Sequence, residues 1–181
     1  MGAQSVPRPI TVEEYERIPD PPGGRYELHH GEVVFVARPV KQHKELQRRL
    51  RRMLETKSDA EGYIADTEFP YRPLPENEVW GGDVACVSGA RYQATNKWLE
   101  GSSELVIEVK SPSDTKAEMH DRAMTTLAGA GGVEFWIIDA ETATVLVHRK
   151  ASGMRVYSAD EAIPLPMFDS QIVLSDLFAG L

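Results

Sequence analysis

Two carboxylates and a lysine on successive apolar stretches are the side chains with the clearest chemical potential in this sequence. Asp83 stands near the start of the stretch Trp80–Ser88. Glu108 and Lys110 stand two residues apart in the stretch 104–111. Side chains alternate across a strand, so Glu108 and Lys110 share one face, roughly 6.6 Å apart along the strand. Charged side chains are rare in such strands unless they are paired, bind a metal or take part in chemistry.

This set of residues suits the hydrolysis of a phosphodiester. That reaction needs a cation that offsets the charge of the phosphate and a water made nucleophilic near neutral pH. Mg²⁺ is bound through one or two carboxylates plus waters and substrate oxygens, so Asp83, Glu108 and the Val109 carbonyl are candidate ligands for Mg²⁺ or Mn²⁺. Lys110 would position the attacking water.

Electrostatics favours a bound ion between the two acids. Two carboxylates ~5 Å apart repel by about 3 kcal/mol at an effective dielectric near 20, a cost that a cation in the gap offsets. The alternative is a surface pair of Glu108 and Lys110 on an edge strand, with Asp83 only ending a turn.

Hydrophobic periodicity predicts an α/β fold, in which a mixed sheet is flanked by helices. Thr11 and Thr115 each stand three residues before a glutamate, the spacing of a helix-capping box. Helices are expected over 11–18 and 42–61, from Ser113 or Thr115 to Ala128, and, short and weak, within 90–99. Strands are expected over 25–30, 32–37, 63–72, 80–88, 104–111, 133–139, 144–148, 154–157 and 172–174.

Composition predicts one domain over residues 1–181, with residues 1–10 as a loose arm. The formal net charge of −8 argues against broad electrostatic attraction to nucleic acid. No apolar run approaches membrane-spanning length, so no membrane partner is expected. The first residues predict no secretion leader, and the one cysteine, Cys86, suits a reducing compartment, so a cytoplasmic location is expected.

Two groups of residues near the predicted second helix have two interpretations each. The arginines of that helix could contact phosphates or could form an ordinary solvated face, and the pattern does not separate these readings. They are Arg48, Arg49, Arg51 and Arg52. His43, at the start of the helix, is by itself best read as a surface histidine.

Five motifs in a fixed order give the chain a family resemblance. They are Tyr26-Glu-Leu-x-x-Gly-Glu-Val, His43 ahead of a helix, Asp83-Val-Ala-x-Val, Glu104-Leu-Val-Ile-Glu-Val-x-Ser-Pro-Ser and Gly132-Val-Glu-Phe-Trp-Ile-Ile-Asp. In this order the chain resembles the Uma2 family of endonucleases, in the PD-(D/E)XK superfamily, from about Thr11 to Phe178. The resemblance implies a restriction-endonuclease-like core, a Mg²⁺-type ion and nuclease activity. It matches Glu27 and His43 to the family's early acid and histidine, and Asp83 and Glu108 to its two central acids.

The sequence departs from the family pattern at three positions. Gly82 stands where the family usually has proline. Lys110 stands where it more often has an apolar residue. The family commonly has a lysine on the following helix, at the position aligned here to Met124.

The hypothesis is therefore a metal-dependent endonuclease that hydrolyses DNA through an Asp83…Glu108-x-Lys110 site. Glu27 and His43 would line the same pocket, with Glu27, Asp83 and Glu108 converging beside the Lys110 amine. One alternative is a nuclease-fold module that binds nucleic acid or regulates but does not cut. Another is a structural α/β domain whose polar strand face packs on a partner. The sequence leaves the oligomeric state open, with a homodimer among the options.

Overall fold

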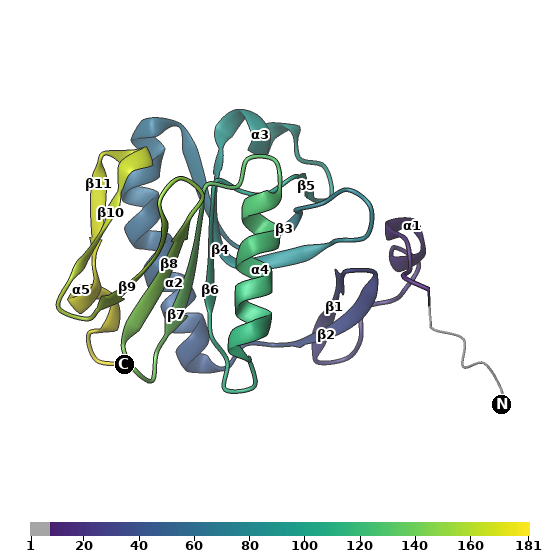
Figure 1. The fold of residues 1–181 in the computed structure, drawn as a ribbon, viewed down its shortest axis with the longest axis horizontal. Coiled ribbons are helices and arrows are strands. Elements are labelled where there is room, and N and C mark those ends of the chain that lie inside the picture. The colour runs from purple at the N-terminus through teal and green to yellow at the C-terminus, as the bar shows by residue number, and fades with distance from the viewer. Residues whose placement is uncertain (1–7) are drawn as a thin grey trace.

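A mixed β-sheet with long helices on its two faces forms the body of the protein (Figure 1). The computed structural model describes residues 8–181. The seven-stranded sheet has the order β5-β3-β4-β6-β7-β8-β9, with parallel pairing only for β3 with β5 and β6 with β7. Its strands are β3 (Tyr63–Arg72), β4 (Trp80–Ser88), β5 (Leu99–Glu100), β6 (Leu105–Val109), β7 (Glu134–Asp139), β8 (Thr144–Arg149) and β9 (Gly153–Ser158). The predicted fold class is confirmed.

Helix α2 (Lys41–Ser58) covers one face of the sheet. Its apolar stripe of Leu46, Leu50 and Leu54 is fully buried and packs in one cluster with Ile107 of β6 and Trp136 of β7. The 3₁₀ turn Asp59–Glu61 extends the helix, as the longer prediction anticipated.

Helix α4 (Lys116–Ala128) covers the other face and begins with the predicted capping box. Met119, Ala123 and Leu127 pack in a second buried cluster with Val106 of β6 and Phe135 of β7. Alternation along β6 therefore sends Ile107 towards α2 and Val106 towards α4. Because this chain covers both faces of β6, no polar strand face is left there for a partner to pack on.

A separate antiparallel hairpin, β1 (Gly24–His29) with β2 (Glu32–Ala37), stands beside the sheet (Figure 1). It joins the body where Leu28 and Val79 exchange backbone hydrogen bonds of 2.8 and 2.9 Å. Leu28, Val79 and Val12 of helix α1 (Val12–Tyr15) form a third, small buried cluster. Of the predicted loose arm, residues 1–7 lie outside the described part of the chain. Ile10 packs against this small cluster.

The remaining elements are short. Helix α3 (Gly89–Ala94) occupies the stretch predicted as a weak helix. The C-terminal part contains β10 (Ala162–Leu165), the 3₁₀ turn Pro166–Phe168, β11 (Ser170–Val173) and α5 (Leu174–Phe178). The β10–β11 pair extends the buried cluster on the α2 face through Ile163 and Ile172. No helix in residues 8–181 combines the length and the apolar character needed to cross a membrane.

Candidate active site

Asp83 holds β4 and β6 together at the point where their pairing ends. The pairing runs from Cys86 with Leu105 to Val84 with Ile107. Beyond it, the Val109 backbone N–H donates a 2.7 Å hydrogen bond to Asp83 Oδ2. The carboxylate therefore replaces a strand carbonyl as acceptor where the two strands separate. Asp83 is only 9% exposed.

Helix α2 contacts the same carboxylate with two side chains. Gln47 Nε2 donates to Asp83 Oδ1 at 2.8 Å. His43 Nε2 lies 2.9 Å from Asp83 Oδ2, yet it is buried and makes no hydrogen bond. The structure thus brings His43 and Asp83 together, and it leaves one imidazole nitrogen without a hydrogen bond beside the acid.

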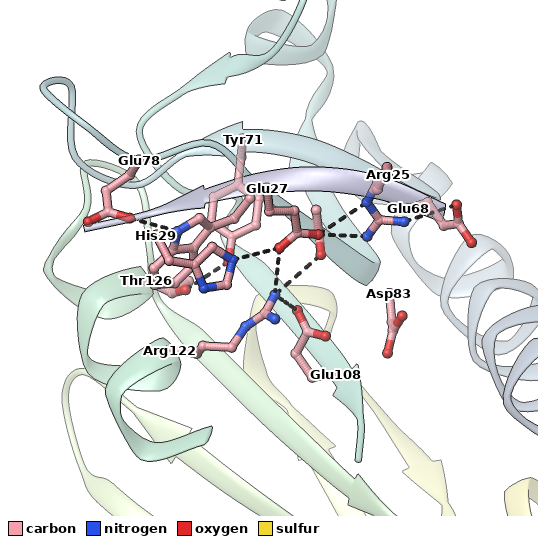
Figure 2. A network of polar contacts seen from close by, with 12 residues as sticks. Arg25, Glu27, His29, Glu68, Tyr71, Glu78, Asp83, Glu108, Arg122 and Thr126 are labelled. Atoms are coloured by element: carbon pink, nitrogen blue, oxygen red, sulfur yellow. Dashed lines mark hydrogen bonds and ion pairs between the residues drawn. The ribbon is translucent and has the colours of Figure 1, made fainter. Parts of the chain in front are cut away.

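Glu108 has a different partner, on α4. Arg122 Nη2 donates to Glu108 Oε1 at 2.8 Å and lies 3.7 Å from Glu27 Oε2. Figure 2 shows the Arg122 guanidinium between these two carboxylates, with Asp83 close by. Glu27 and Glu108 are therefore brought together by one largely buried cation.

Glu27 comes from β1 and is almost completely buried, at 2% exposed. Arg25 Nη2 donates to Glu27 Oε1 at 2.8 Å, and His29 Nε2 lies 2.8 Å from Glu27 Oε2 (Figure 2). Arg25, Glu27 and His29 alternate along one strand, so their side chains share a face. The hairpin thereby supplies an acid that already has an arginine and a histidine as partners.

These surroundings separate the acidities of the two carboxylates. Burial raises the pKa of Glu27, but the His29 hydrogen bond and the Arg122 and Arg25 charges outweigh it and lower that pKa to about 2. Burial raises the pKa of Glu108 well above its ordinary value, against the effect of Arg122, and the charges of Asp83 and Glu27 raise it further. Burial lowers the pKa of Arg122, yet the charges of Glu108 and Glu27 give it a net increase. Glu27 is therefore firmly ionised, and Glu108 binds a proton more readily.

Lys110 lies just past the end of β6 and has a different partner. Its ammonium is 2.9 Å from Asp139 Oδ2, and this pair raises the pKa of Lys110. Within residues 8–181 no ion pair joins Lys110 to Asp83 or Glu108. Of the three predicted site acids, Glu27 and Glu108 share Arg122, and Asp83 contacts His43. The Lys110 amine pairs with Asp139 instead of with any of these acids.

Two cavities flank the buried acids. One of about 270 Å³ is lined by His43, Val109 and Lys110, among others. Another of about 360 Å³ is lined by Arg25 and Glu27, among others. Glu27 and His43, predicted to line one pocket, thus line two different cavities. Within residues 8–181 no three His, Cys, Asp or Glu side chains are grouped so as to hold a metal by themselves.

The arginines of α2 are mostly paired within their own helix. Arg48 and Arg49 contact Glu45, and Arg51 contacts Glu55 at 3.1 Å. The neighbouring glutamates therefore offset most of the positive charge of these arginines.

Sequence reasoning missed the residues that partner the acids, above all Arg122 and Gln47. The family pattern contains a signal for Arg122, because the family commonly has a lysine on this helix at the position aligned to Met124, two positions further on. Met124 is instead 50% exposed and lines a different cavity. At Gly82, an added Cβ would lie 3.0 Å from Val106 Cγ1, which accounts for a small residue there.

The structure is similar to a solved structure from Anabaena variabilis, described as a putative nuclease belonging to DUF820. The TM-score is 0.80 at 19% sequence identity, and the match covers 94% of this chain and 98% of the other. The likeness establishes the fold. No curated protein matches the chain.

The family follows from a match along most of the sequence. The family model described as "Uma2: Putative restriction endonuclease" matches residues 12–177. The chain belongs to the Uma2 family. The family is described as one of restriction endonucleases, a class of enzymes whose substrates are nucleic acids.

Proposed function

We propose that this protein is a metal-dependent endonuclease that hydrolyses DNA phosphodiester bonds at Asp83 and Glu108. One observation carries the proposal: two carboxylates are buried at the separating ends of β4 and β6, near enough for the Asp83 charge to raise the pKa of Glu108. Burying two acids together costs free energy unless a cation offsets their charge.

The residues present fit a hard divalent cation. Carboxylate and carbonyl oxygens with open positions for water are the usual ligands of Mg²⁺. Asp83, Glu108 and the Val109 carbonyl would hold Mg²⁺ or Mn²⁺. The ion would offset charge on the phosphate and lower the pKa of nearby water.

Cationic side chains of the protein would contact the phosphate and position the water. Lys110, bonded to Asp139, must leave that partner to position the attacking water. Arg122, which contacts Glu108 here, would turn towards the phosphate when Glu108 serves as a metal ligand. His43 would assist at the Asp83 side and Glu27 would hold Arg122 in reach.

Cleavage of plasmid DNA tests the proposal. With Mn²⁺ or Mg²⁺, at low salt and near neutral pH, the protein should nick or cut DNA, and EDTA should stop it. Glu108→Gln should abolish cutting and metal binding because it removes a ligand charge. Glu76→Gln, the same change at an exposed acid, should leave both intact.

Two further variants identify the cation that serves the reaction. Lys110→Met should abolish cutting while leaving metal binding largely intact if lysine holds the water. If Lys110→Met cuts like the original and Arg122→Met does not, Arg122 has that role. If neither change affects cutting, both assignments are wrong.

The alternative of a non-cutting nuclease-fold module has its own support. Arg122 neutralises the acid that the ion requires, and Lys110 is engaged elsewhere. If the original protein binds metal and DNA but cuts neither DNA nor RNA, this alternative replaces the proposal.

A further inference from the structure

The segment from Val33 to Lys44 has an unusual charge for this acidic protein. It contains Arg38, Lys41 and Lys44 and no Asp or Glu, whereas the whole chain has a net charge of −8. The first turn of α2, which the segment enters, also lacks acidic residues. The segment is therefore a local basic region.

These three cations have no carboxylate partners among residues 8–181. Within the described residues 8–181, twelve of the 20 lysines and arginines form ion pairs, which leaves eight without one there. Three of the eight are Arg38, Lys41 and Lys44, and all three are exposed. Their charge is free for a partner, unlike that of the paired arginines further along α2.

Exposed apolar side chains accompany the cations. Phe35 is 51% exposed and Val40 is 70% exposed, and Val33 and Val34 are more than one-third exposed. Strand β2 is exposed along nearly its whole length, and the hairpin stands out from the body (Figure 1). A two-stranded ribbon of this kind fits the major groove of a DNA duplex.

The segment leads directly to the candidate active site. It contains His43, which lies 2.9 Å from Asp83. A cavity of about 240 Å³ is lined by Arg38 and Lys44 together with Arg25, the partner of Glu27. A strand of nucleic acid bound along the segment would therefore pass the buried acids.

We infer that Val33–Lys44 is the surface that binds the DNA substrate, with Arg38, Lys41 and Lys44 on phosphates and the exposed β2 side chains against the groove. This inference rests on the proposed nuclease function, which requires a DNA-binding surface on an acidic protein. Phosphate contacts supply most of the affinity of such surfaces, and each contact contributes about 0.9 to the salt slope on B-DNA.

Binding of a fluorescent DNA duplex in EDTA tests the surface without hydrolysis. The variant with Arg38, Lys41 and Lys44 all changed to Gln should bind with a weaker salt dependence. Its slope of log K against log salt should be less negative by about 2.7. Its affinity at 0.1 M salt should fall on the order of 10²-fold. The matched control changes Arg17, Lys57 and Lys150 to Gln, which removes the same charge from cations that also lack ion pairs. The control should change binding by less than a few-fold.

The contribution of the exposed apolar side chains can be measured separately. Phe35→Ser should weaken duplex binding without changing the salt slope, because no phosphate contact is lost. Thermal melts of each variant show whether it is folded as the original is.

The outcomes separate this surface from the catalytic proposal. If the triple variant binds like the original, or only an Arg48→Ala, Arg52→Ala variant loses binding, the inference is wrong even where the original cuts DNA. If the original binds DNA through this segment and never cuts, the surface stands and the catalytic proposal fails. Binding to anionic lipid vesicles with no binding to DNA would assign the segment to a membrane surface instead and overturn the inference.

Discussion

Replacing Arg122 with methionine removes a guanidinium that contacts both Glu108 and Glu27. Glu27 keeps Arg25 and His29, but Glu108 loses the cation that opposes its burial. Removing one partner of a buried ion pair costs about 3–5 kcal/mol, because the other charge stays buried alone. For a chain of this size, that loss lowers Tm by roughly 6–20 °C.

The loss should depend on pH. The folded protein raises the pKa of Glu108, so it binds this proton more tightly than the unfolded chain does. Such a carboxyl group costs stability as the pH rises above its unfolded pKa of about 4.3. Arg122 opposes that increase in pKa, so the cost grows without it. The variant should therefore lose more stability at pH 8 than at pH 5.

Urea denaturation followed by circular dichroism at both pH values measures the effect. Arg155→Met removes an arginine from a largely exposed ion pair with Glu161 and should cost no more than about 1 kcal/mol. The double change Arg122→Met, Glu108→Gln should recover part of the loss because the unpaired charge is gone. A loss below about 1 kcal/mol at pH 8, or equal losses at both pH values, would refute the reasoning.

Two other properties of the charged network can be measured. Mg²⁺ or Mn²⁺ at ten times its dissociation constant should stabilise the protein by about 1.4 kcal/mol, and Asp83→Asn should lose this gain in a thermal melt. A melt unchanged by either ion at millimolar concentration would count against a metal site. His30 has its ring nitrogens 2.7 Å from Glu78 and 2.7 Å from Asp121, and the Asp121 hydrogen bond raises its pKa. The stability that comes from this raised pKa is fully present below the unfolded pKa of about 6.5. It is lost as the pH rises through the pKa of His30 in the folded protein. His30→Gln should therefore destabilise the protein more at pH 6 than at pH 9. Equal destabilisation at both pH values would show that His30 does not act through its charge.

Most of the sheet was predictable because its signals are local. The predicted bounds of β3 and β4 match the observed ones, and the capping residues of α1 and α4 act as expected. The strand β10 was missed because it contains Pro164, and proline is read as a loop signal. It forms because β11 pairs with it and the buried cluster accepts Ile163.

The sequence predicts the acids of the candidate site, but it does not predict most of the side chains that contact them. Strand parity holds only inside a strand, and β6 ends at Val109, so Lys110 is free to turn to Asp139. Asp83 turns to satisfy the Val109 N–H, which alternation alone does not anticipate. The contact of Arg122 with Glu108 depends on how α4 lies across the sheet, and spacing along the chain does not specify that.

The β1–β2 hairpin attaches to the body through a small cluster, a few backbone hydrogen bonds and its charged side chains, while the main sheet has two large cores. Elements with few buried apolar contacts open at lower free energy than the whole molecule unfolds. Glu27 would then leave the site whenever the hairpin opens, while the seven-stranded sheet remains intact. Heating would in that case dismantle the candidate site before the protein melts, so thermal inactivation and thermal unfolding would report on two different parts of the chain.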